Sequence, residues 1–199
     1  MTMTSESAHR LPRWVVPGEH AVSDVACLAL RGVVENRSRQ ECAGMVAAIG
    51  WVRHLVPRGP VTGRDELVIT LEVAQAESFA AASPRTDWRS PPLREVCEVL
   101  GAEYWPAPEV DPGYLWGVCA TLRWLSDTDG AEPPLPIPVR TATGAVATQE
   151  QVYSCLRARN PGRLEGWERA ALGREASEIA ARSQYLADLV IDTCIRARA

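Results

Sequence analysis

Apolar residues recur every three to four positions along most of the chain, which is the spacing of one face of an α-helix. In a first helix, expected over residues 19–34, this stripe consists of Val22, Val25, Ala26, Ala29 and Val33. The same spacing predicts helices over residues 38–56, 93–100 and 112–125. We therefore expect an all-α fold, a multi-helix globular bundle.

Polar side chains mark several helix starts. Ser38 with Glu41 and Thr148 with Gln151 have the spacing of a capping box, and Asp111 followed by a proline is typical of an N-cap. In the helix expected after Ser38, small residues line one side: Ala43, Ala47 and Gly50. Such a row permits the close approach of a neighbour, so we expect this helix to be central.

Residues 64–82 fit two patterns. Alternation of apolar side chains over residues 66–73 resembles a strand, whereas Ile69, Val73, Ala76 and Ala80 fit a helix. A lone strand would leave its backbone groups without a ladder, and no second convincing strand is present. We expect a helix that Arg64, Asp65 and Glu66 open, with the state of residues 66–73 left open.

The pattern divides the chain into four parts. Residues 1–18 read as a flexible tail, although Trp14 is suited to docking onto the body. Residues 19–126 form the helical body, and residues 127–147 form a Pro-rich linker or strap. Residues 148–199 are expected to form a C-terminal helical hairpin whose long last helix packs on the body or on a partner.

Composition changes this picture little. The chain has 199 residues, 46% apolar and 23% charged, with a net charge of -4 and arginine as its only strongly basic residue type. The acidic balance makes nucleic acid an unlikely partner. The six cysteines form no CxxC pair, so we expect free thiols and no metal or cofactor. With no secretory signal or membrane segment apparent, a cytoplasmic location is expected.

The aromatic residues of the middle region are the most unusual feature. The helix expected over residues 112–125 is apolar on two sides, one of them formed by Trp116, Ala120 and Trp124. The simplest interpretation is a central core helix. The functional alternative is that the aromatic side meets a partner, a second copy or an apolar ligand. Candidate ligand- or partner-binding residues are Tyr104, Trp105, Trp116 and Trp124.

A basic run lies near the C-terminal hairpin. Its candidate residues are Arg157, Arg159, Arg163 and Arg169, diluted by Glu165 and Glu168. Such a run is more often a solvated helix face than a contact for an acidic partner or a nucleic acid.

The sequence contains no catalytic constellation and resembles no family that its motifs identify: P-loop, GxGxxG, GxSxG and HExxH are all absent. Our leading hypothesis is a non-catalytic helical protein–protein interaction or assembly protein, with self-association as one form. One alternative is a helical enzyme or small-molecule binder with an aromatic-lined pocket. Another is a nucleic-acid-associated accessory protein.

Overall fold

The computed structural model describes residues 11–83, 91–106, 109–160 and 162–197. Within these residues the chain is all-α, as predicted, with isolated β-bridges in place of a sheet. Contacts divide it into a first unit, Met1–Leu135, and a second unit, Pro136–Ala199. The helices are α1 (Glu19–Val34), α2 (Arg39–Val52), α3 (Leu71–Ala82), α4 (Leu93–Leu100), α5 (Pro112–Leu125), the 3-10 turn η3 (Thr128–Gly130), α6 (Gln149–Arg159) and α7 (Gly166–Arg196).

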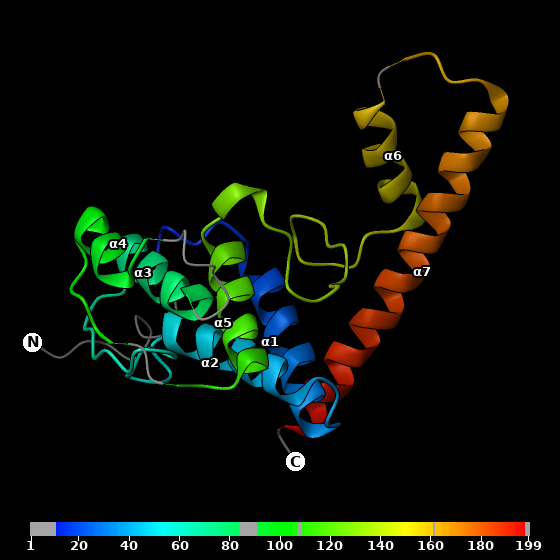
Figure 1. Cartoon of the computed structure of the whole chain (residues 1–199). Helices are drawn as coiled ribbons and strands as arrows, with labels where there is room; N and C mark the ends of the chain where they lie inside the picture. Colours follow the sequence, from blue (N-terminus) through cyan, green and yellow to red (C-terminus); the bar gives the residue numbers. More distant parts are fainter. Residues whose placement is uncertain (1–10, 84–90, 107–108, 161, 198–199) are drawn as a thin grey trace, which may run out of the picture. The chain divides into compact units, whose positions relative to one another are not determined.

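The first unit is organised around α2 and α5. Helix α2 packs on one side against α1 and on the other against α5, and α5 packs in turn against α3 (Figure 1). Burial follows this arrangement, since Trp51 on α2 and Val118 on α5 are fully buried. The predicted central position of the second helix is confirmed.

The close approach of α2 to α5 depends on glycines that do not belong to the predicted row of small residues. A Cβ added to Gly44 would lie 2.1 Å from the carbonyl oxygen of Tyr114, and one added to Gly117 would lie 2.0 Å from that of Glu41. At Gly50 the nearest atom is 3.8 Å away, an ordinary contact. The backbones of α2 and α5 therefore touch through Gly44 and Gly117.

The ambiguous segment is neither a strand nor a helix over most of its first half. Helix α3 begins at Leu71, after Thr70, whose hydroxyl accepts from the Val73 N–H at 3.3 Å. The expectation that Arg64 to Glu66 open a helix is wrong, because Asp65 forms a β-bridge with Arg58 and Arg64 is buried. Ile69, which precedes the helix, is buried in the core.

Two of the three predicted caps form. The Asp111 carboxylate accepts from the backbone N–H groups of Gly113 and Tyr114, and Thr148 with Gln151 completes a capping box. The box predicted at Ser38 is wrong, since Ser38 has a left-handed backbone with φ 43° and makes no side-chain cap. Helix α2 also ends at Val52, four residues before the predicted end.

Residues 11–18, the described part of the predicted tail, are attached to the rest of the first unit, and residues 1–10 lie outside the described residues. The indole Nε1 of Trp14 donates to the carbonyl of Ile69 at 2.8 Å, and the Val16 N–H donates to the carbonyl of Leu125 at 2.9 Å. At the other end of this unit, Leu135 packs on a cluster formed by Ala29, Cys42 and Met45.

The second unit is a helical hairpin with a small core of its own. Ala147, Val152 and Ala176 form its buried centre, against which Tyr153, Leu156 and Ile179 pack. Helix α6 has 11 residues and α7 has 31, so α6 is about 16 Å long and α7 about 46 Å. Glu165 and Glu168 form a capping box at the start of α7.

Candidate functional site

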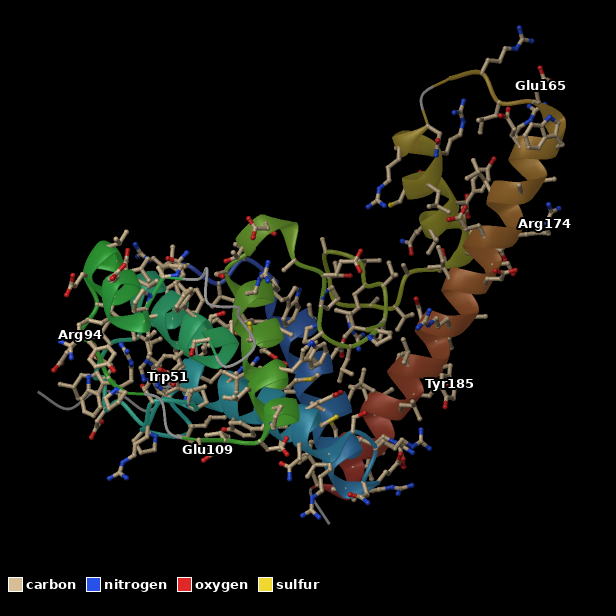
Figure 2. All side chains as sticks on the ribbon, in the orientation of Figure 1. Trp51, Arg94, Glu109, Glu165, Arg174 and Tyr185 are labelled. Carbon is tan, nitrogen blue, oxygen red and sulfur yellow. The ribbon has the colours of Figure 1, made fainter. Side chains whose placement is uncertain are left out.

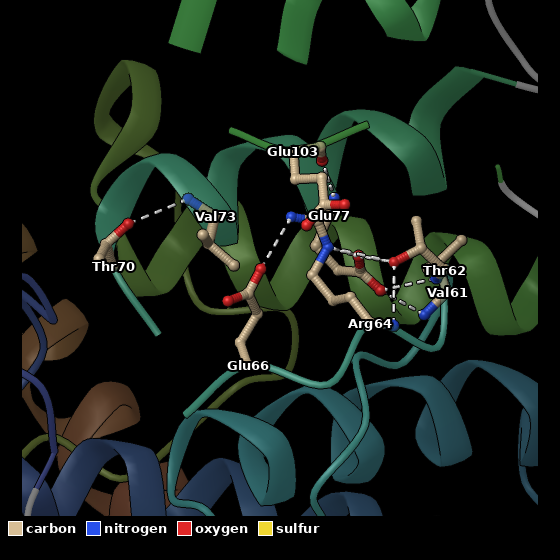
Figure 3. Close-up of polar contacts among 8 residues, drawn as sticks. All are labelled: Val61, Thr62, Arg64, Glu66, Thr70, Val73, Glu77 and Glu103. Carbon is tan, nitrogen blue, oxygen red and sulfur yellow. Dashed lines mark hydrogen bonds and ion pairs between the residues drawn. The ribbon is translucent and has the colours of Figure 1, made fainter. Parts of the chain in front are cut away.

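The first unit holds a buried ion pair that sequence analysis missed. Glu77 on α3 is 0% exposed and Arg64 is 1% exposed, with the Arg64 Nε 3.3 Å from the Glu77 Oε2 (Figure 3). Charged side chains are rarely buried to this extent unless they are paired. This pair is therefore the first place to look for chemistry.

The Glu77 carboxylate is occupied on both oxygens. Its Oε1 accepts from the backbone N–H groups of Val61 and Thr62, at 2.6 and 2.8 Å. Its Oε2 accepts from the Thr62 hydroxyl at 2.8 Å, besides facing Arg64. The carboxylate thus holds the loop before α3, as Figure 3 shows, and has little capacity left to act as a base.

The Arg64 guanidinium joins three parts of the first unit. Its Nε donates to the Thr62 hydroxyl at 3.2 Å and its Nη2 donates to the carbonyl of Glu103, beyond α4, also at 3.2 Å. Its Nη1 makes no hydrogen bond within the described residues and lies 3.9 Å from the Glu66 Oε1. Arg64 and Glu77 act as a clasp on the loop over residues 59–66.

Tyr114 on α5 completes this clasp. Its hydroxyl donates to the carbonyl of Pro60 at 3.0 Å. Burial raises the pKa of the Tyr114 phenol, and the negative charge of Glu77 raises it further. The phenol therefore stays protonated and keeps its hydrogen bond to the loop.

No sequence motif predicts the pairing of Arg64 with Glu77. Arg64 and Glu77 are 13 positions apart, and Arg64 sits in a run that favours a helix start. One indirect signal exists, because Glu77 falls within the apolar, alanine-rich sequence AQAESFAAA. A carboxylate in the middle of a helix and surrounded mainly by alanine is a candidate for burial with a partner.

The four predicted aromatic residues lie in different environments. Tyr104 is 36% exposed, with the Arg94 guanidinium carbon 4.4 Å from the centre of its ring. Trp105 is half-buried, with an indole N–H that finds no partner within the described chain. On α5, Trp116 is 37% exposed whereas Trp124 is buried. On the aromatic side of α5, Trp124 therefore belongs to the core, whereas Trp116 is partly exposed at the surface.

An open cavity of about 450 Å³ lies beside α3, α4 and α5. Other residues than the four aromatics line it, chiefly Phe79, Val96, Leu100 and Cys119. At its edge, the Arg123 Nη2 lies 3.1 Å from the Asp129 Oδ2. The Ser78 hydroxyl donates to the Cys119 thiol at 3.8 Å, and the one carboxylate of the lining, Asp129, is paired with Arg123.

The predicted basic residues all fall in the second unit. Arg157 and Arg159 are in the last turn of α6, where they oppose the negative end of the helix dipole, and Arg157 donates to the carbonyl of Asn160. Arg163 follows in the connection to α7, and Arg169 is exposed in α7. Among them, Arg159 lines a second cavity, of about 250 Å³.

The described residues show neither a metal site nor a membrane-spanning helix. They contain no cluster of three or more His, Cys, Asp or Glu side chains placed to hold a metal ion. In the same part of the chain, no helix combines the length and the apolar character required to cross a bilayer. Comparison with family models, curated proteins and solved structures finds no match for this chain.

Proposed function

We propose that this chain is a non-catalytic protein–protein interaction or assembly protein that acts through α7. The observation that carries the proposal is a pair of large apolar side chains on that helix. Ile191 is 56% exposed and Ile195 is 63% exposed, one helical turn apart. Branched apolar side chains exposed together on one helix face favour a partner that removes them from water.

Exposed aromatic residues on the same helix support the proposal. Trp167 is 71% exposed and Tyr185 is 60% exposed, and Figure 2 shows Tyr185 projecting from α7. The two are 18 residues apart, about five full turns, so they share one side of the helix. Tryptophan and tyrosine are enriched among the interface residues that contribute most of the binding free energy.

The proportions of the hairpin add a second support. Helix α6 is about a third as long as α7, so it can cover only part of α7. A long helix of this kind is stabilised by packing rather than by its own propensity. A second copy of the chain is the simplest partner.

Light scattering coupled to size exclusion tests the proposal. The full chain is expected to show, at rising concentration, a mass above the 21.7 kDa of one copy. The double substitution Ile191→Glu and Ile195→Glu is expected to return it to one copy, because two carboxylates cannot be desolvated in an apolar contact.

The matched control is Ser154→Glu, which adds a charge at an exposed position of α6, away from the α7 side chains that carry the proposal. This control should keep the mass of the parent protein. A parent protein of one copy at all concentrations, or a double variant that still associates, would contradict the proposal.

A further inference from the structure

The second unit contains a cavity of about 250 Å³ between α6, the loop before it and one side chain of α7. Gln151, Cys155 and Arg159, each four residues from the next, all line it from α6. Since each residue of a helix rises 1.5 Å, the cavity follows α6 for about 12 Å. It is a short groove along the helix rather than a round pocket.

The floor of this groove is apolar. Val152 and Ala147 are buried beneath it, and Leu156 and Ile179 line it as half-buried side chains. Val139 adds a further apolar wall from the loop. A purely ionic ligand such as sulfate would leave this floor without a contact, so the groove favours an alkyl chain.

The polar part of the lining is positive. It holds two arginines, Arg140 and Arg159, with Thr141 and Gln151, and no aspartate or glutamate. Arg140 donates from its Nη1 to the carbonyl of Gly144 at 2.9 Å, so its guanidinium is held by the loop. Arg159 is exposed at the end of the groove, where its planar fork is suited to a carboxylate.

We propose that this groove binds a small amphipathic carboxylate, with its alkyl chain along α6 and its carboxylate at Arg159. The volume is below the roughly 300–1,000 Å³ of pockets for larger ligands, which restricts the ligand to a short chain. The inference does not depend on the proposed interaction through α7, because different residues carry it.

Octanoate is the probe, titrated into the full chain by calorimetry. Acetate, which lacks the chain, and octanol, which lacks the charge, should each bind at least about tenfold more weakly, because each loses one of the two contacts. Arg159→Gln should weaken octanoate binding by about tenfold, the loss of one charge-assisted pair. Arg174→Gln, an exposed position on α7 outside the lining, is the matched control and should bind as the parent does.

Cys155 reports where the ligand sits. It is exposed and lines the groove, so octanoate should slow its alkylation by iodoacetamide while leaving Cys119 of the first unit unaffected. Ile179→Trp, which fills the floor, should abolish both the protection and the binding. Equal binding by the parent and Arg159→Gln, octanoate binding without protection of Cys155, or no octanoate binding at millimolar concentration would each overturn the inference.

Discussion

At the scale of single residues, the clasp between Arg64 and Glu77 concentrates most of the buried charge of the first unit. Burying two ions costs desolvation free energy that their attraction alone does not always offset. Here hydrogen bonds from Val61 and Thr62 occupy the Glu77 carboxylate, and those from Arg64 to Thr62 and to the Glu103 carbonyl occupy Nε and Nη2 of the guanidinium. Removing one partner is therefore costly, because the other charge stays buried.

We expect Glu77→Ala to lower the free energy of unfolding by about 3–5 kcal/mol, the cost of a buried charge left alone. Urea unfolding followed by circular dichroism measures it. The control is Glu66→Ala, because the Glu66 carboxylate is 28% exposed and 3.9 Å from Arg64, and its loss should cost less than about 1 kcal/mol. Equal losses in the two variants would show that Glu77 does not hold the loop.

Tyr114 gives the clasp a dependence on high pH. Burial, and then the charge of Glu77, raise the pKa of Tyr114 above its value in the unfolded chain. The unfolded state then loses this proton at lower pH, so the contribution to stability is complete below the unfolded pKa near 10 and falls as pH rises toward the folded pKa. Tyr114→Phe should remove this part of the decline above about pH 10 in urea titrations. An unchanged slope would contradict the assignment.

At the scale of elements, two glycines set the distance between α2 and α5. The backbone of each helix lies where a Cβ of the other would sit, with Gly44 against the Tyr114 carbonyl and Gly117 against the Glu41 carbonyl. Both overlaps involve backbone atoms, which cannot turn aside as a flexible side chain does. A larger residue at either position must push the two helices apart.

Gly44→Ala is expected to destabilise the protein by about 1–3 kcal/mol, the usual cost of overpacking a core. Gly50→Ala on the same helix should have the opposite sign and stabilise by about 0.5–1 kcal/mol, because alanine favours the helix and meets only an ordinary contact at 3.8 Å. Thermal unfolding of the two variants against the parent tests the pair. Destabilisation of both by the same amount would place the cause in α2 itself rather than in its contact with α5.

At the scale of the whole molecule, the two units differ in the size of their cores. The first unit buries large side chains such as Trp51, Met45 and Leu122, whereas Ala147, Val152 and Ala176 form the centre of the hairpin. Alanine contributes little apolar area, so the hairpin core supplies less hydrophobic stabilisation. The two units are therefore expected to open with different free energies.

Native-state hydrogen exchange should show this difference. Amides in the centre of α5 are expected to exchange by global opening of the first unit, and amides of α6 to exchange at least about tenfold faster, through local opening. The Gly44→Ala substitution should speed exchange in α5 and leave α6 unchanged. Matching protection of α5 and α6, in the parent and in this variant, would show one cooperative unit instead.

Prediction from sequence succeeded where the physics is local. The bounds of α1 and the caps at Asp111 and Thr148 depend on side chains within a few positions of each other. It failed at Ser38 and at residues 64–70, where the local signals for a helix start were present. At Ser38 the chain turns through a left-handed backbone after Asn36, which has φ 57°. At Arg64 a carboxylate 13 residues away takes the side chain into the core.

The candidate sites divide in the same way. The sequence identified Arg159 only as one member of a basic run, and it identified the aromatic residues by type alone. Their roles depend on what surrounds them: Trp124 is buried, Trp116 is partly exposed, and Arg159 stands at the end of a groove. Whether such a side chain is exposed depends on which face of its helix another helix covers. The spacing of residues within one helix does not predict this.

The amino-acid sequence by itself determined that this protein is helical and where most of its helices begin and end, because periodicity and capping act between near neighbours. Only the tertiary structure decided that Gly44 and Gly117 let two backbones touch, that Arg64 and Glu77 are buried together, and that a groove forms along α6. Those features join residues far apart in the chain, and their energy comes from contacts that exist only after the helices have packed.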